Sequence, residues 1–352
     1  MQKNNVRAEA LEKMRTQHTA VEQVILRRRS VRRYKQEQVP EWMVHRILEA
    51  GRFAPSSGNC QPWKFVVVRD KKIIDELSAD VMQIARSYNR MLDYRSNRSW
   101  WRRKLANLMI RRMPNMLHPT PFGVTKLFSD GVIGLYHDAP TAILIFKDVR
   151  GIASPDLDNG IAGQNMVLAA HSMGLGTCWV GFTKLAFEKK PKWNKLFGID
   201  YPYAFANSIA IGWPQGEADG MVPRPLHPID WFEDGTAKTF FADGVRRSLP
   251  ASERKVIPDY GDKALFPPGE IAVDNDKCNG CGLCVKICPV GALETQQKSV
   301  IMKAPEEHEC FLCGACYSIC PTEAIQTVAG PGYSGRFTDL DRGALTLPQL
   351  AP

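Results

Sequence analysis

The residues best suited to chemistry in this 352-residue chain are its ten cysteines. Cys60 and Cys178 stand apart, and the other eight form two runs with spacers of two, two and three residues, each run followed by proline: Cys278, Cys281, Cys284 and Cys288, then Cys310, Cys313, Cys316 and Cys320. Three cysteines at such spacing wrap a short loop, so that their thiolates point to a common centre. The spacing therefore predicts metal ligation.

A double run of this kind is typical of two [4Fe–4S] cubanes, with the cysteine before proline ligating the other cluster. The first cluster would be held by Cys278, Cys281, Cys284 and Cys320. The second would be held by Cys310, Cys313, Cys316 and Cys288. Two structural zinc sites are the alternative, but zinc ribbons use CxxC pairs across a longer loop. Residues 271–330 thus resemble a bacterial two-cluster ferredoxin.

Composition places the chain among globular proteins. Hydrophobic residues make up 44% and charged residues 24%, which excludes a disordered or collagen-like chain. No apolar run approaches the roughly 20 residues of a transmembrane helix. The first residues lack the apolar core of a secretion signal, so we expect a cytoplasmic protein in which thiols stay reduced.

Four stretches outside the cysteine region are further candidates for chemistry. Residues 28–32 (RRSVR) combine three guanidinium groups with a hydroxyl, which suits a phosphate, although a solvated basic face is the alternative. Residues 54–63 (APSSGNCQPW) predict a rigid polar loop, or an ordinary turn. Residues 174–181 (GLGTCWVG) run from a helix into a strand, unlike a dinucleotide fingerprint. Arg224 stands between two prolines.

In this order the stretches resemble the FMN-dependent nitroreductase family. A Gly212–Pro214 turn and the segment 158–165 add two further matches, and the resemblance covers about residues 20–245. It implies an α+β fold, a nitroreductase-like mixed sheet flanked by helices, with a small ferredoxin-like C-terminal domain after it. It also implies FMN as cofactor and a homodimer with FMN in the subunit interface.

The resemblance further implies roles for single residues. The phosphate of FMN would be bound by Arg28, Ser30 and Arg224, with Arg29 lining the cofactor and Arg32 near N1 and the C2 carbonyl of the flavin. The ring and ribityl chain would lie along Pro55, Ser56, Ser57, Asn59 and Gln61. The N5 edge would meet the backbone of Val180 and Gly181. No catalytic residue is assigned. We expect Cys60 to be an inert buried thiol, and a reactive thiol near the flavin is the alternative.

Helices are predicted over residues 9–28, from Pro40 at a first helical position, and over 161–173 up to Gly174. Strands are predicted over 64–69, 141–146, 176–180 and 206–211. These elements divide the chain into a nitroreductase-like domain at 1–245, a linker at 246–270, a ferredoxin domain at 271–330 and a tail at 331–352.

A basic insertion at about residues 86–130 holds much of the net charge of +9. It fits a lid over a large apolar substrate, a peripheral membrane contact through residues 95–117, or a dimer-packing helix with a solvated basic face. The basic surface would also suit an acidic electron carrier. No nucleic-acid reader motif accompanies the charge, so nucleic acid is not expected as a partner.

Together these patterns predict an FMN- and iron–sulfur-dependent oxidoreductase. Electrons would pass from the [4Fe–4S] clusters to FMN and then, as hydride, to a small-molecule substrate carrying a nitro group, an activated alkene or a similar acceptor. The donor would be ferredoxin, flavodoxin or NAD(P)H. The alternative is an NAD(P)H- or ferredoxin-linked electron-transfer or redox module without a small-molecule substrate of its own.

Overall fold

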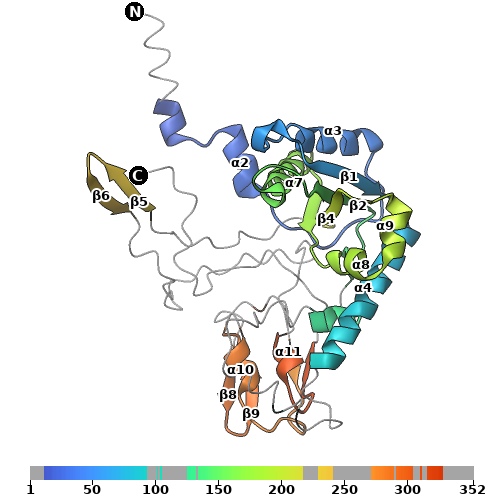
Figure 1. Ribbon diagram of the computed structural model, residues 1–352. Coiled ribbons are helices and arrows are strands. Elements are labelled where there is room, and N and C mark those ends of the chain that lie inside the picture. The colour runs from blue at the N-terminus through green and yellow to red at the C-terminus, as the bar shows by residue number, and fades with distance from the viewer. Residues whose placement is uncertain are drawn as a thin grey trace, which may run out of the picture.

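The computed structural model describes residues 12–92, 101, 104, 125–131, 134–216, 229–240, 271–288, 291–303, 310 and 315–327. The larger unit is built on a four-stranded sheet in the order β1-β2-β4-β3 (Figure 1). Its strands are β1 (Trp63–Val68), β2 (Thr141–Asp148), β3 (Gly176–Trp179) and β4 (Tyr203–Gly212). Every neighbouring pair of these strands is antiparallel. A parallel bridge between Ser30 and Thr177 adds a short segment beside β3.

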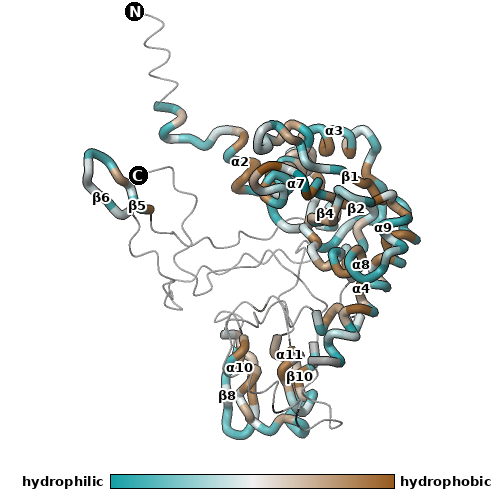
Figure 2. Tube along the Cα trace, in the orientation of Figure 1, coloured by the Kyte–Doolittle hydropathy of each residue, from teal (hydrophilic) through white to brown (hydrophobic). Residues whose placement is uncertain are grey.

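Helices cover both faces of this sheet. They are α2 (Ala20–Arg27), α3 (Glu41–Arg52), α4 (Lys71–Leu92), α7 (Pro155–Ser172), α8 (Lys184–Lys189) and α9 (Pro191–Phe197). The central strand β2 is buried on both sides because its alternate side chains enter two different cores. Ile143 and Ile145 pack with α3 and α7, whereas Leu144 and Phe146 pack with α4, α8 and α9. Figure 2 shows hydrophobic and hydrophilic bands alternating along α4, as expected for a helix with one face on a core.

The structure confirms an α+β fold and each predicted strand to within a few residues. Gly174 ends α7 with a φ of +81°, as predicted for a glycine after the last helical turn. The prediction for Pro40 was wrong by one position, because Pro40 is the N-cap residue and α3 begins at Glu41. The predicted helix at 9–28 is interrupted, since Thr19 and Glu22 form a capping box that starts α2 at Ala20.

The ferredoxin-like unit consists of two similar halves. Its elements are β7 (Ile271–Val273), α10 (Leu283–Ile287), β8 (Leu293–Gln296), β9 (Ser299–Met302), α11 (Ala315–Ile319) and β10 (Ile325–Thr327). Strand β7 pairs with β10 and β8 pairs with β9, both antiparallel. A separate hairpin of β5 (Ile229–Glu233) and β6 (Thr236–Phe240) has almost entirely exposed side chains.

Most of the predicted insertion lies outside the described residues, as do the predicted linker and tail. Of the stretch 95–117, the structure describes Trp101, which is 54% exposed, and Lys104. At the C-terminal side of the insertion, residues 125–129 are helical and lie against α4. In the part of the chain that the structure describes, no helix has the length and apolar character needed to cross a membrane.

Gly163 of α7 should resist substitution, because a Cβ there would overlap the ring of Trp179 and approach Ile145 Cδ1 to 3.1 Å. We expect Gly163→Ala to lower the free energy of unfolding by about 1–3 kcal/mol. Gly160→Ala on the same helix is the matched control, since nothing lies within 4 Å of its Cβ position. We expect that control to raise stability by about 0.5–1 kcal/mol. Urea denaturation of both variants measures the difference, and equal effects would contradict this packing.

Candidate functional site

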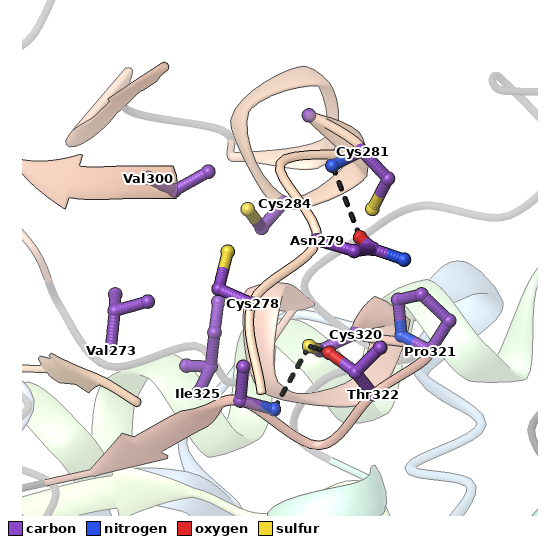
Figure 3. A pocket seen from close by; sticks show the side chains of 12 residues that line it. Val273, Cys278, Asn279, Cys281, Cys284, Val300, Cys320, Pro321, Thr322 and Ile325 are labelled. Carbon is purple, nitrogen blue, oxygen red and sulfur yellow. Dashed lines mark hydrogen bonds between the residues drawn. The ribbon is translucent and has the colours of Figure 1, made fainter. Parts of the chain in front are cut away.

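Four of the predicted cluster ligands surround one pocket in the ferredoxin-like unit (Figure 3). The sulfurs of Cys278 and Cys284 point into the same space, with Cys281 and Cys320 at its other sides. The pocket is otherwise lined mainly by small and apolar residues. Four thiols around one apolar space form the donor set that a cubane requires, so these residues fit a [4Fe–4S] cluster.

The electrostatics of the pocket agree with a ligand site that needs a metal. Burial, with smaller contributions from the neighbouring thiols of Cys281 and Cys320, raises the pKa of Cys284 to about 11. A cluster of thiolates that repel one another in a buried site is stabilised when metal ions supply the opposite charge. Among the described residues, no group of three or more His, Cys, Asp or Glu side chains is spaced to ligate a single metal ion.

The cysteine before each proline is held in the same way in both halves. Cys288 accepts a hydrogen bond from the backbone N–H of Ala292 (3.3 Å), and Cys320 accepts one from Ala324 (3.2 Å). Gly280 has a φ of +65° and a Cβ there would lie 2.7 Å from the carbonyl oxygen of Lys298, so this turn requires glycine. Backbone N–H groups at ligand sulfurs raise the reduction potential of a cluster.

The second predicted ligand set is described in part. Cys288, Cys310 and Cys316 are half-buried, and Cys316 and Cys320 both lie at or next to α11. Cys313 lies outside the described residues. The pocket therefore supports the crossed ligation for the first cluster, in which Cys320 of the second run joins three cysteines of the first.

The arginine stretch lies along the edge strand of the sheet. The backbone N–H of Val31 donates to the carbonyl oxygen of Thr177 (2.9 Å), beside the bridge of Ser30. This approach requires Gly176, because a Cβ at that position would lie 2.7 Å from Cβ of Val31. The result is that Arg28, Arg29, Ser30 and Arg32 sit half-buried beside β3, whose chain continues to Val180 and Gly181.

The positive charge of these guanidinium groups shifts the pKa values of neighbouring side chains. Burial and the charge of Arg32 lower the pKa of His137 to about 3. Burial, Arg28 and Arg29 lower the pKa of His171. Burial raises the pKa of the Cys178 thiol, whereas a hydrogen bond and charge from Arg32 act in the opposite direction. Both histidines are therefore neutral near pH 7, and the net charge of this pocket comes from arginine, as an anion site requires.

The predicted polar loop is anchored on the beginning of α7. The backbone N–H of Ser57 donates to Oδ1 of Asp158 (3.4 Å), and Nδ2 of Asn159 donates to the carbonyl oxygen of Pro62 (2.9 Å). Within the loop, Ser56 Oγ accepts from the backbone N–H of Gln61, and the Gln61 amide donates to Asn59. The loop contains a 3-10 turn, η1 (Ser57–Asn59), and its residues Pro55, Asn59 and Gln61 are exposed.

Two acceptors beneath this loop are buried without a hydrogen-bond partner among the described residues, Asp158 Oδ2 and Asn159 Oδ1. Such acceptors are costly unless a donor reaches them. Ribityl hydroxyls and the flavin ring N–H are donors of the right kind, so the loop fits FMN. Cys60, predicted to be buried, is exposed, because the loop turns it outward.

The turn after β3 is fixed by buried hydroxyl groups. Ser208 Oγ donates to the carbonyl oxygen of Val180 (2.6 Å) and shares hydrogen bonds with Thr183 and Tyr136. The hydroxyl of Tyr136 also lies 2.8 Å from that of Thr183. These residues are 2% exposed or less, so the backbone of Val180 and Gly181 is held rigidly at the end of the strand.

The structure thus brings the predicted phosphate residues to the β3 edge, next to Val180 and Gly181, and places the loop 55–61 at the start of α7. Arg224 lies outside the described residues. Sequence reasoning missed His137, which approaches Arg32 from the segment before β2, and the anchoring role of Asp158 and Asn159. The resemblance of segment 158–165 to the nitroreductase family could have indicated Asp158 and Asn159. No local sequence pattern distinguished His137.

Comparison with known families now identifies the chain. Residues 25–213 match the nitroreductase family, and residues 271–294 and 306–326 match the 4Fe-4S binding domain. The chain belongs to the nitroreductase family and carries a ferredoxin-type domain at its C-terminal side, which confirms the predicted fusion. It is an oxidoreductase of that family, and two matched segments support two [4Fe–4S] clusters.

Several individual proteins are similar to part of this chain. A protein from Methanothermobacter thermautotrophicus, provisionally named NADH dehydrogenase/NAD(P)H nitroreductase, is 27% identical over 59% of this chain and 86% of its own length. Human iodotyrosine deiodinase 1 is 24% identical over 59% of this chain and 66% of its own length. The crystal structure of a nitroreductase with bound FMN from Desulfitobacterium hafniense is 25% identical, with a TM-score of 0.44, and covers 59% of this chain and 96% of that one.

Proposed function

We propose that this chain is an FMN- and [4Fe–4S]-dependent oxidoreductase in which a ferredoxin domain at 271–330 supplies electrons to a flavin site in a domain at 1–245, with a linker between them and a tail after them. The observation that carries the proposal is the coexistence of an arginine-lined site beside β3 and a four-cysteine pocket in one chain. Covalent linkage makes the electron delivery intramolecular, at high effective concentration.

At the flavin site, Arg28 and Ser30 hold the phosphate, with Arg29 beside them and Arg224 as a third contact. Arg32 places a permanent positive charge where the reduced ring accumulates negative charge. Its hydrogen bond with the buried Cys178 and its proximity to neutral His137 orient that guanidinium group. When bound, FMN supplies hydride chemistry at N5 and exchanges electrons singly or in pairs.

The remaining residues shape the proposed flavin site. The fixed backbone of Val180 and Gly181 faces the reactive edge, and the buried hydroxyl network behind it prevents that turn from shifting. The loop with Pro55, Ser56 and Ser57 lies along the ring, while Asn59 and Gln61 brace the loop by their mutual hydrogen bond. Cluster ligands are the eight cysteines of the two runs: Cys278, Cys281, Cys284, Cys288, Cys310, Cys313, Cys316 and Cys320.

The substrate class is a small organic acceptor of hydride, with a nitro group, an activated alkene or a carbon–halogen bond. The carbon–halogen bond is included because one relative is named as a deiodinase. The protein's contribution to each is the same placement of an acceptor over a rigidly held ring. The alternative is an NAD(P)H- or ferredoxin-linked redox module without a small-molecule substrate. A turnover screen with these three acceptor classes separates the two functions, because only the enzyme would reduce one of them.

The functional unit is proposed to be a homodimer. Helix α2 has no buried residue although it is well capped, and Val21 and Ile25, one turn apart on it, are 67% and 49% exposed. Leu157 at the start of α7 is 62% exposed beside the loop anchor. Apolar surface of this kind is typical of a partner interface. A second subunit would bring its loop 55–61 to the arginine site.

We expect light scattering after size exclusion to give the mass of two chains. Val21→Asp with Ile25→Asp should shift the protein to a monomer and release FMN, because two charges would enter an apolar interface. Gln23→Asp on the exposed face of α2 is the control and should remain dimeric. A wild-type chain that is monomeric with FMN bound would contradict the dimer.

Arg28→Ala should weaken FMN binding about tenfold to a hundredfold, because it removes a charge-assisted hydrogen bond to phosphate. Flavin fluorescence titration measures the dissociation constant. Arg27→Ala is the matched control, since Arg27 is exposed at the end of α2 whereas Arg28 is half-buried. Equal affinities of the two variants would remove Arg28 from the phosphate site.

Cys281→Ala should lower the iron content from about eight atoms per chain and abolish flavin reduction by a one-electron donor. Direct reduction by NAD(P)H, if the flavin accepts it, should persist, because that route bypasses the clusters. Cys60→Ala is the control, as this exposed thiol belongs to neither run. Normal turnover of the cluster-deficient variant with its one-electron donor would refute the relay.

A further inference from the structure

The ferredoxin-like unit contacts the nitroreductase domain through Tyr317 of α11. Its hydroxyl donates to Oδ2 of Asp130 (3.1 Å), and its ring centroid lies 6.0 Å from Nζ of Lys126. The ring packs against the apolar core of the ferredoxin-like unit and also against that of the nitroreductase domain. One side chain therefore bridges two units whose contacting residues are 187 positions apart in sequence.

The surface that receives Tyr317 is rigid. Residues 125–131 are fastened to α4 by Arg86, whose Nε donates to the carbonyl oxygen of Ser129 (2.6 Å), and by Asn89, whose Nδ2 lies 2.6 Å from Ser129 Oγ. Lys126 and Asp130 form an ion pair of 2.9 Å with side chains only 22% and 27% exposed. The acceptor of the tyrosine hydroxyl is thus held in place before docking.

From this surface, packed aromatic side chains lead toward the flavin site. Phe128 is 2% exposed and stacks on Phe182, with ring centroids 6.4 Å apart and an interplanar angle of 9°. Phe182 directly follows Gly181 at the end of β3. Tyr317, Phe128 and Phe182 thus belong to one hydrophobic cluster, which extends to the residue next to the backbone assigned to the flavin edge.

The two halves of the ferredoxin-like unit differ at this point. Tyr317 directly follows Cys316, a ligand of the second cluster, whereas the equivalent position after Cys284 in the first half is Val285. Valine carries neither a ring of that reach nor a hydroxyl. The pseudo-symmetry of the cysteine ligation is thus broken at one surface position, on the side of the second run.

We infer that residues 125–131 are the docking site for α11 and that the cluster held by Cys288, Cys310, Cys313 and Cys316 is the one that passes electrons to the flavin. Tyr317 is the positioning residue of this contact. The inference rests on the proposed function. An external low-potential one-electron donor reduces the clusters. Two successive transfers each oxidise one reduced cluster by one electron, and the two electrons with one proton from solvent would reduce oxidised FMN to its anionic two-electron form, the form whose negative charge Arg32 faces.

The test compares Tyr317→Ala, Tyr317→Phe and Val285→Ala in the full-length protein loaded with FMN and clusters. Hydrogen–deuterium exchange of residues 125–131 reports docking without reference to activity. We expect faster exchange there in Tyr317→Ala only, because loss of the ring uncovers the segment. Iron, sulfide and FMN content should be equal in all four proteins, which shows that each variant folds.

Electron delivery is measured in the same proteins by anaerobic reduction with a photoreduced one-electron donor, following flavin absorbance. Tyr317→Ala should slow flavin reduction about tenfold or more, since small displacements of reacting centres have large rate effects. Tyr317→Phe keeps the ring and should restore most of the rate, and Val285→Ala should match wild type. An additional variant, Asp130→Asn, should reduce its flavin at a rate between those of wild type and Tyr317→Ala, because it keeps an acceptor for the tyrosine hydroxyl but loses the charge.

Two negative outcomes are distinguishable. If wild-type flavin is not reduced through the clusters at all, the proposed function fails, and with it the electron-transfer role of Tyr317. If wild-type transfer occurs but Tyr317→Ala leaves both the rate and the exchange of residues 125–131 unchanged, the docking inference alone is wrong. A slower rate in Val285→Ala than in Tyr317→Ala would assign the contact to the other cluster.

Discussion

The hydrogen bond from Val31 to Thr177, made possible by the missing side chain of Gly176, positions the arginine stretch that we assign to the phosphate of the cofactor. Without that close approach, the stretch 28–32 would be a basic loop with no fixed relation to the sheet. With it, three guanidinium groups lie at one strand edge, and the same strand carries its backbone on to Val180 and Gly181. The residues proposed for the phosphate and those proposed for the flavin edge are thereby placed by a single strand.

Placement at a strand edge is useful only if the strand end is rigid. The hydroxyls of Tyr136, Thr183 and Ser208 come from three different parts of the chain and hydrogen-bond to one another, and Ser208 donates to the carbonyl oxygen of Val180. Each is almost fully buried, so each hydrogen bond forms in a medium where leaving it unmade would be costly. A turn between a strand and a helix is normally flexible, and this network holds its backbone in a fixed position.

The iron–sulfur unit follows a different rule, because its ligands define its fold. The N–H bonds from Ala292 to Cys288 and from Ala324 to Cys320 repeat in both halves, as expected for two copies of one ligation pattern. The outer surface need not repeat, and Tyr317 has no counterpart in the first half. In the electron path that we propose, this difference between the two surfaces determines which cluster faces the nitroreductase domain.

The sequence by itself determined whatever depends on neighbours within a few residues. Cysteine spacing predicts the cluster pattern because a short loop limits where thiolates can reach, and the apolar run 141–146 predicts a buried strand because both of its faces need cover. Gly174 marks a helix end for an equally local reason.

Only the tertiary structure decided which distant groups meet. The approach of His137 to Arg32, the anchoring of Ser57 by Asp158 and the contact of Tyr317 with Asp130 depend on sheet order and on how units pack. The outward turn of Cys60 likewise follows from the loop's anchors at α7. Periodicity and spacing carry no information about such contacts, because they arise from long-range packing whose partners leave no pattern in the local sequence.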